Sequence, residues 1–264
     1  MIDNKNIVLT GGSSGIGKSI LERLAKGSGN KIIVACRSAA SITGFGENVI
    51  PFTCDLSSKE GVDSLFEKIS EEFDMADIII SNAGAPYYEK IDYVDWGRIE
   101  RIYNLNTISH IYIYQKYLEH LNGRMGHLCY TISAMGEMAL PGYALYSSTK
   151  FAMKGFQQAI RREGVKNLKL TCIYPVSTST NFFNVGGNGI EMEKPFPVQT
   201  PEKVADVTIK AIEKGKKNVY PCGLYIFSKV LMTILPPVRS IYLGMEQKRL
   251  ERFLARVEAA KKEQ

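Results

Sequence analysis

The sequence predicts a doubly wound α/β fold, in which one parallel sheet carries helices on both faces and a helical C-terminal extension follows. Short apolar segments alternate with amphipathic stretches, as in parallel sheets whose strands are joined by right-handed helical crossovers. The candidate strands are continuously apolar, for example at Ile78-Ile79-Ile80, which is typical of a sheet covered on both faces. No linker or repeat divides the 264 residues, so we expect a single domain.

The candidate elements can be placed in order along the chain. Six apolar segments are candidate strands: residues 6–10, 31–36, 49–53, 77–81, 126–133 and 169–174. Five amphipathic segments are candidate helices: residues 15–26, 58–73, 98–121, 146–163 and 201–214. Residues 1–220 are expected to form the sheet domain, and residues 221–264 an apolar and amphipathic helical extension of that domain.

Charge and cysteine content narrow the function classes. The net charge of +6 is modest, and no basic and aromatic module of the usual kinds is present, so no nucleic-acid partner is expected. The five cysteines are widely spaced without a CxxC pair, which favours buried small hydrophobic residues over a metal site or disulfides. This usage suits a reducing, cytoplasmic compartment. The N-terminus leads straight into a strand, which predicts no signal peptide. The cysteines are Cys36, Cys54, Cys129, Cys172 and Cys222.

A glycine-rich turn follows the first candidate strand and opens into the first candidate helix. Glycine lets a backbone approach a pyrophosphate closely, and a helix N-terminus attracts the negative charge. The spacing differs from the common GxGxxG pattern. A tight strand-to-helix turn without a ligand is the alternative interpretation. The candidate nucleotide-binding residues here are Gly11, Ser13, Ser14, Gly15, Ile16 and Gly17.

Tyr146 and Lys150 form a candidate proton-transfer pair, with Ser133 thirteen residues upstream of Tyr146. Residues i and i+4 share one face of a helix, so the lysine would lie one turn from the phenol. A nearby ammonium favours the phenolate, and bringing a phenol of pKa about 10 near neutrality needs roughly 4 kcal/mol. Taken alone, the pair could also be an exposed helical pair, and Ser133 a strand-end cap.

These motifs together resemble the classical short-chain dehydrogenase/reductase family. The resemblance rests on the TGxxxGIG pattern at 10–17, on Ser81-Asn82-Ala83-Gly84, and on Asn106, Ser133, Tyr146 and Lys150, which occur in family order and at family spacing. It covers about residues 5–220. It implies a Rossmann fold, a nicotinamide cofactor and hydride transfer between that cofactor and a carbonyl or alcohol carbon.

The resemblance also implies a role for each catalytic residue. Tyr146 is expected to be the general acid/base, and Lys150 to lower the pKa of Tyr146 and to bind the nicotinamide ribose. Ser133 is expected to polarise the substrate oxygen. Asn106 is expected to hold a water that links Lys150 to a proton relay. His110, His120 and His127 match no motif and are interpreted as structural or surface residues.

The cofactor contacts that the resemblance implies extend over most of the chain. They are Asn82, Ala83 and Gly84 beside the adenosine ribose, Asp55 and Leu56 at the adenine, Pro175 and Thr180 near the nicotinamide, and Tyr146 and Lys150. Two positions depart from the family pattern. Ser81 replaces an asparagine, which costs a hydrogen bond, and Val176 replaces a glycine, which alters how the backbone passes the nicotinamide.

The residues at the end of the second strand indicate whether the cofactor carries a 2′-phosphate. Preference for NAD usually needs a carboxylate there, but the chain has Cys36 followed by Arg37 and Ser38. A guanidinium binds a 2′-phosphate well, so NADP(H) is expected over NAD(H), which stays possible. The alternative is that Arg37 is a solvated charge. NADPH pools are usually reducing, so carbonyl reduction is the expected direction.

Residues 181–200 lie where the family places a substrate lid. This segment has aromatic and aliphatic side chains among Gly186, Gly187 and Gly189, and Tyr87 and Tyr88 are expected near the same cleft mouth. We therefore expect a hydrophobic or aromatic carbonyl substrate, although these side chains could equally pack the lid onto the body. The lid side chains are Phe182, Phe183, Ile190, Met192 and Phe196.

The tail departs from the family pattern. Residues 219–228 and 230–238 are apolar, but neither segment reaches the ~20 residues of a spanning helix. Residues 245–264 then place Leu250, Phe253, Leu254 and Val257 at helical spacing among six basic residues. The tail is expected to pack on the lid or on a partner subunit, with a peripheral position on an anionic membrane as the alternative.

Three functions are compared on these grounds. The favoured one is an NADP(H)-dependent carbonyl reductase, a homodimer or homotetramer paired through residues 98–121 and 146–163. A catalytically silent NADP(H)-binding sensor or scaffold is the alternative, but such proteins typically lose the tyrosine, lysine or serine that this chain keeps. An epimerase or dehydratase of the extended branch is disfavoured by the short length and the glycine spacing.

Overall fold

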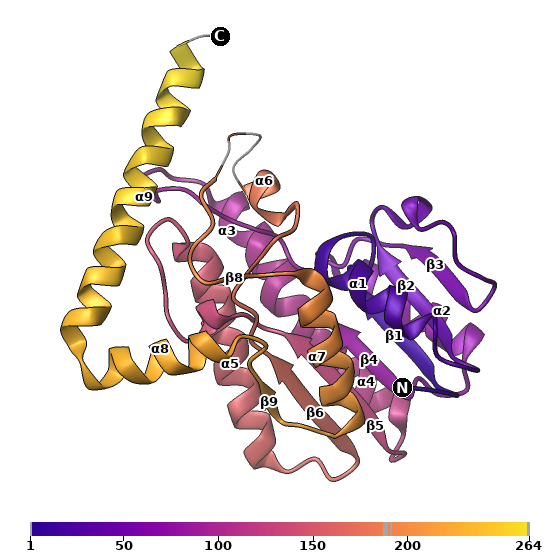
Figure 1. Cartoon of the computed structure of the whole chain (residues 1–264). Helices are drawn as coiled ribbons and strands as arrows, with labels where there is room; N and C mark the ends of the chain where they lie inside the picture. Colours follow the sequence, from indigo (N-terminus) through magenta and orange to yellow (C-terminus); the bar gives the residue numbers. More distant parts are fainter. Residues whose placement is uncertain (1, 187–189, 191, 263–264) are drawn as a thin grey trace.

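The computed structural model describes residues 2–186, 190 and 192–262, and its centre is a seven-stranded parallel sheet (Figure 1). The strand order is β3-β2-β1-β4-β5-β6-β9, so the chain reverses direction across the sheet between β1 and β4. This is the Rossmann-type fold that the sequence predicted. The strands are β1 (Asn6–Thr10), β2 (Lys31–Cys36), β3 (Val49–Thr53), β4 (Ile78–Ser81), β5 (Gly126–Thr131), β6 (Leu168–Ile173) and β9 (Asn218–Val219).

All six predicted strands are present, three of them with the predicted ends and three with ends that differ by one or two residues. The seventh strand, β9, was not predicted because its two residues are too short to show a pattern. It is a strand only because Cys172 and Ile173 of β6 pair with it. Two further short strands, β7 (Ser177–Thr178) and β8 (Val198–Gln199), pair with each other at the two ends of the lid segment.

Nine α-helices occur in the described residues. They are α1 (Gly15–Leu24), α2 (Lys59–Glu72), α3 (Trp96–Tyr103), α4 (Ser109–Leu121), α5 (Ala144–Glu163), α6 (Phe182–Gly186), α7 (Pro201–Glu213), α8 (Gly223–Ile234) and α9 (Pro236–Lys262). Side-chain caps fix several N-termini: Ser58, Asp95 and Thr200 accept hydrogen bonds from the backbone N–H groups of Gly61, Arg98 and Lys203. The predicted helix at 98–121 is three segments, because a π-helical turn at Asn104–Ile108 separates α3 from α4.

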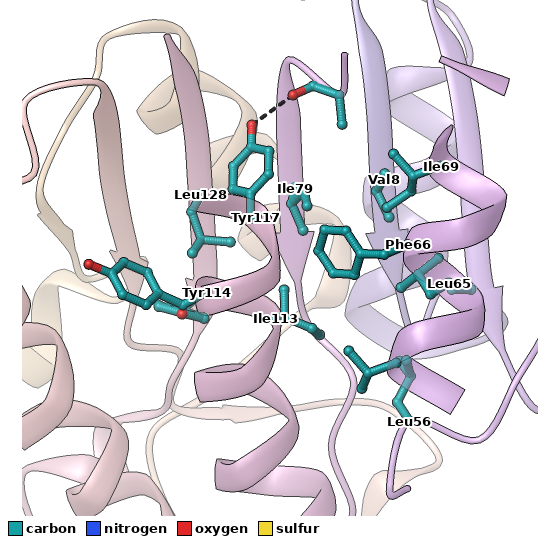
Figure 2. Packing of buried hydrophobic residues seen from close by; sticks show 14 of the residues in the cluster. Val8, Leu56, Leu65, Phe66, Ile69, Ile79, Ile113, Tyr114, Tyr117 and Leu128 are labelled. Atoms are coloured by element: carbon teal, nitrogen blue, oxygen red, sulfur yellow. Dashed lines mark hydrogen bonds between the residues drawn. The ribbon is translucent and has the colours of Figure 1, made fainter. Parts of the chain in front are cut away.

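Two hydrophobic cores, one on each face, confirm that the sheet is doubly wound. On one face α2, α4 and α5 cover Val8, Ile33, Ile79 and Leu128, and Figure 2 shows part of this cluster. On the other face α1 and α7 cover side chains from the same strands, among them Ile78 and Ile80. The consecutive isoleucines of β4 therefore serve both cores, which explains the continuously apolar pattern. All five cysteines are free and buried.

The C-terminal helices lie beyond the edge of the sheet (Figure 1). The predicted amphipathic helix at 245–264 begins earlier, at Pro236, and its last two residues lie outside the described part. Among the described residues, no single helix is long and apolar enough to cross a membrane. The pair of α8 and α9 meets that test by length and composition, but the chain bends by 118° between them.

The Tyr117 hydroxyl links α4 to the amino ends of two central strands and provides a test of this packing. It donates to the carbonyls of Ala76 (2.8 Å) and Asp77 (3.0 Å) and accepts from the His127 N–H (3.2 Å). Figure 2 shows Tyr117 and draws one of these hydrogen bonds. Tyr117→Phe leaves buried polar groups without this partner, so we expect a loss of about 1–3 kcal/mol in unfolding free energy, measured by urea denaturation.

Tyr112→Phe on the same helix is the matched control. Its hydroxyl donates to Asp63 at a half-buried site that water can reach, so the expected loss is below about 1 kcal/mol. Equal losses in the two variants would contradict a special role for the buried contact.

Candidate active site

A cleft of about 710 Å³ opens at the carboxyl ends of the parallel strands. It is lined by the glycine turn, by the ends of β2 to β6, by the lid and by the inner sides of α8 and α9. Every predicted catalytic and cofactor residue lines this cleft except Asn106. The topology explains this gathering, because parallel strands end at the same edge of the sheet.

The glycine turn can be made only by glycine. Gly11 and Gly15 have φ values of 70° and 54°, which are unfavourable for residues with a side chain. A Cβ on Gly17 would lie 2.0 Å from the Gly11 carbonyl oxygen. The turn brings the backbone against the cleft at the N-terminus of α1, where Ser14 makes no capping hydrogen bond. These features fit the phosphates of a dinucleotide.

Asn82 ties the glycine turn to the centre of the sheet. Its side-chain amide donates to the carbonyls of Thr10 and Gly11, both at 3.2 Å, and its oxygen accepts from the Thr131 hydroxyl at 3.0 Å. The Thr10 hydroxyl in turn accepts from the backbone N–H groups of Asn82 and Ala83. The residues after β1, β4 and β5 are thereby held together at the floor of the cleft.

Ser81, which departs from the family pattern, has a buried partner in His110. The Ser81 hydroxyl lies 2.5 Å from Nδ1 of His110, and Nε2 lies 3.0 Å from the Ala83 carbonyl oxygen. A carbonyl can only accept, so Nε2 carries the proton and Nδ1 accepts from Ser81. Burial, together with the nearby Lys150, lowers the pKa of His110 to about 3, so the ring is neutral.

The interpretation of His110 as an unspecific structural or surface residue was therefore incomplete. It supports the Asn82-Ala83-Gly84 segment from behind. The signal in the sequence was its position one helical turn after Asn106, combined with the unusual Ser81.

Tyr146, Lys150 and Ser133 converge in the cleft as predicted. Tyr146 and Lys150 lie on consecutive turns of α5, both are buried, and the Lys150 Nζ lies 5.6 Å from the centre of the Tyr146 ring. The Lys150 ammonium donates to the Thr131 carbonyl at 3.3 Å. Ser133 follows β5 with a φ of 148°, a rare conformation for a residue with a side chain, and its hydroxyl accepts from the Met135 N–H.

The ionisation of this pair differs from the sequence-based expectation. Burial raises the pKa of Tyr146 to about 12, and a hydrogen bond with Ser133 opposes this only in part. Burial also lowers the pKa of Lys150 to about 8. The expected fall in the pKa of Tyr146 is not found, because desolvation dominates in this closed aromatic surrounding. At neutral pH the site therefore presents a neutral phenol beside a mostly charged lysine.

Asn106 is completely buried behind the cleft, in the π-helical turn. Its side chain accepts from the Ala85 N–H (2.8 Å) and donates to the Ala85 carbonyl (3.0 Å) and the Thr149 hydroxyl (3.4 Å). Gly84 lies between it and Lys150: a Cβ there would be 3.4 Å from the Asn106 oxygen and 3.7 Å from the Lys150 Nζ. The side-chain amide of Asn106 therefore holds the backbone of Ala85 and the Thr149 hydroxyl in position.

The substrate side of the cleft is aromatic. The ring of Tyr146 packs edge-on against Phe182 of the lid, with 5.6 Å between ring centres. Tyr87 and Tyr88, expected at the mouth, are instead buried outside the cleft lining: Tyr88 packs on Tyr143 and on Phe253 of α9. Both tyrosines therefore belong to the apolar cluster that includes Tyr146 and Phe183 of the lid, but they support the cleft from behind and do not line it.

Helix α9 also holds the lid. Glu193 pairs with Arg252 at 2.7 Å and Arg256 at 2.9 Å, and the Tyr242 hydroxyl donates to the Phe196 carbonyl at 2.9 Å. Hydrogen bonding to Arg252 is the largest of the effects that lower the pKa of Glu193 to about 2. The lid side chains Phe182, Phe183, Ile190 and Met192 pack in one cluster with α9. Gly187 and Gly189 lie outside the described residues.

Comparison with known proteins places the chain in a family. The short chain dehydrogenase family model matches residues 5–188. Estradiol 17-beta-dehydrogenase 11 of Macaca fascicularis is 26% identical over 87% of this chain and 79% of its own length. The 3-ketodihydrosphingosine reductase of Bos taurus is 28% identical over 92% and 78%.

A solved structure supports the same fold. A short chain dehydrogenase from Burkholderia cenocepacia J2315, in complex with NADP, superposes with a TM-score of 0.77 at 19% identity, over 91% of this chain and 98% of its own. Since the family model spans well over half of the sequence and the fold agrees, the chain belongs to the short-chain dehydrogenase/reductase family of nicotinamide-dependent oxidoreductases.

Proposed function

We propose that this protein reduces a hydrophobic ketone or aldehyde with NADPH. One observation carries the proposal: Ser133, Tyr146 and Lys150 converge in a cleft that has the glycine turn at one end and an apolar, aromatic wall at the other. The retention of all three residues argues against a catalytically silent sensor.

The protonation states support reduction as the favoured direction. A nicotinamide, when bound, supplies the hydride. In this proposal the Ser133 hydroxyl donates to the substrate oxygen, and the neutral Tyr146 phenol protonates that oxygen as negative charge develops. Lys150, charged below a pKa of about 8, stabilises the phenolate that remains.

The proposal of NADP(H) rests on the end of β2. Arg37 and Ser38 line the cleft there, and Ser38 Oγ lies 3.0 Å from Ser13 Oγ in the glycine turn. A guanidinium and a hydroxyl can both donate to a 2′-phosphate, and the strand end carries no carboxylate to repel it. Hydrogen bonds from Ser57 lower the pKa of Asp55, and the positive charge of Arg37 adds to this effect. Arg37 and Asp55 are therefore close enough to interact across this end of the cleft.

The proposed substrate class rests on the aromatic wall and on the relatives. One relative is named as a steroid dehydrogenase and another as a sphingoid-base ketone reductase. The substrates in both names are large, mainly apolar carbonyl or alcohol compounds. The cleft wall near Tyr146 includes Leu140, Phe182 and Phe183, and it suits a substrate of the same chemistry.

We further propose a cytoplasmic homodimer formed through α4 and α5. Two large hydrophobic side chains are exposed in this region: Ile108, directly before α4, and Phe151 of α5. The five free cysteines agree with a reducing compartment.

Tyr146→Phe removes the proton donor and keeps the ring. We expect turnover of carbonyl substrates to fall by about 10²–10⁴-fold, read by NADPH absorbance, while NADPH binding stays within a few-fold. Tyr143→Phe is the matched control, because this neighbouring buried hydroxyl has no hydrogen-bond partner among the described residues and should be dispensable. Retained turnover in Tyr146→Phe would overturn the assigned role.

Arg37→Gln tests the phosphate preference. We expect kcat/KM with NADPH to fall by about 10- to 100-fold, as for the loss of a charge-assisted hydrogen bond, and kcat/KM with NADH to stay nearly constant. Lys31→Gln, at the other end of the same strand, removes the same charge away from the cleft and should change neither value. A ten-fold preference of the wild type for NADH would refute the proposal.

The pH profile tests the ionisation of Lys150. Its lowered pKa means that its positive charge is present below about pH 8 and lost above it, whereas Tyr146 stays protonated well beyond that range. Reduction kcat/KM is therefore expected to decline as the pH rises through about 8. Lys150→Arg keeps the charge and should lack this decline. A decline that persists in that variant would assign the ionisation to another group.

A further inference from the structure

The rim of the cleft is apolar and open to solvent. Five large hydrophobic side chains line the cleft and are nevertheless strongly exposed, from 48% for Leu224 to 66% for Ile241. A water-soluble substrate would not require such a rim, and exposed apolar patches mark interaction sites. The five residues are Val185, Phe196, Leu224, Ile241 and Met245.

Helix α8 continues this apolar surface away from the cleft. Ile226, Val230 and Ile234 follow one another at intervals of four residues, so they form a ridge on one helix face, with Phe227 beside it. These side chains are 45–70% exposed. The opposite side of the helix carries the buried Tyr225 and the cleft-lining Met232. We call the four exposed residues the α8 ridge.

The α8 ridge is held in place by Glu137, which lies in the segment that follows Ser133. Glu137, just after the turn that follows Ser133, accepts hydrogen bonds from Lys229 (2.5 Å) and Tyr225 (3.4 Å) of α8 and forms an ion pair with Lys154 of α5 (3.0 Å). Burial acts to raise the pKa of Glu137, but these hydrogen bonds outweigh it and the pKa is lowered, so the group is charged. The ridge is therefore a fixed surface and not a loose tail.

The exposed charge beside the ridge is basic. Residues 220–245 contain no aspartate or glutamate, and their two charged side chains are Lys229 and Arg239. Lys229 is paired with Glu137, which leaves the exposed Arg239 as the cation of this segment that can meet an anionic headgroup. The next acidic residue, Glu246, is buried against Arg249. An apolar ridge with a basic residue beside it is complementary to an anionic bilayer, in which the apolar side chains reach the acyl boundary and the cation meets the headgroups.

We propose that α8 docks on an anionic phospholipid bilayer, with the α8 ridge in the interface and the apolar rim of the cleft facing the lipid. The corner between α8 and α9 stands away from the body of the molecule, so a surface can approach it without meeting the sheet (Figure 1). An apolar carbonyl compound dissolved in the bilayer then enters the cleft over the rim without crossing water. Docking is independent of the proposed reaction, whereas this route of delivery rests on it.

Sedimentation of the full chain with phosphatidylcholine vesicles, with and without phosphatidylserine, tests docking in the absence of substrate. We expect binding that is stronger with phosphatidylserine and weakened by salt, and a roughly tenfold loss in Phe227→Glu. Met125→Glu is the matched control, because this residue, 55% exposed against 65% for Phe227, precedes β5 at the opposite end of the sheet. Absence of sedimentation, or equal sedimentation of the three proteins, would overturn the proposal.

Two further measurements distinguish docking on lipid from self-association of the chain. Arg239→Glu should weaken binding only to the vesicles that contain phosphatidylserine, and it tests docking even if Phe227→Glu does not fold. Sedimentation velocity without lipid shows whether the ridge joins two copies of the chain. Dissociation of a dimer by Phe227→Glu, with no vesicle binding by the wild type, would assign the ridge to a subunit interface and refute docking.

The rate of ketone reduction then tests whether the substrate enters the cleft from the bilayer. With a long-chain methyl ketone carried in the vesicles, Phe227→Glu should lose most of its rate, whereas with acetophenone in solution it should match the wild type. Equal rates of both proteins on the vesicle-borne ketone would refute delivery from the bilayer. If no protein reduces either ketone, the proposed reductase function fails for these substrates, and the vesicle-binding result stands by itself.

Discussion

The hydrogen bonds around Asn82 are the constraint on which the site depends. Strands β1 and β4 are neighbours in the sheet but are separated by 67 residues of chain between Thr10 and Ile78. At this point the chain reverses its direction across the sheet, and the strand ends leave a crevice. Asn82 closes the crevice at its floor by binding the carbonyls of Thr10 and Gly11. The glycine turn therefore keeps one position relative to Thr131 and to Ser133 beyond it.

A second layer of buried polar groups transmits this constraint to the catalytic side. His110 holds the Ala83 carbonyl, and Asn106 holds both backbone groups of Ala85, so the segment between them has little freedom. Gly84 fits in the remaining space beside the Lys150 ammonium. The neutral state of His110 is a consequence of the same burial, because a second cation beside Lys150 would be unfavourable.

The sequence predicted the parts of the fold whose signals are local. Apolar strands, helix periodicity and the glycine turn are each encoded within a few neighbouring residues, and these elements were placed within one to three residues of their ends. Strand β9, the π-helical turn and the burial of Tyr88 could not be predicted, because each depends on a partner far along the sequence. The burial that raises the pKa of Tyr146 could not be predicted either, since the spacing of Tyr146 and Lys150 carries no information about desolvation.

The tail shows most clearly why periodicity alone was insufficient. Helix α8 is apolar on nearly every side, a pattern that is usual for helices buried all round. Here only one side is buried, against the segment that follows Ser133 and against the cleft, and the other side is exposed. A helix whose outer face met only water would gain nothing from Ile226, Phe227 or Ile234 there. Because Glu137 anchors the inner face, the exposed face has a fixed orientation, and its apolar character is best accounted for by a lipid surface that covers it.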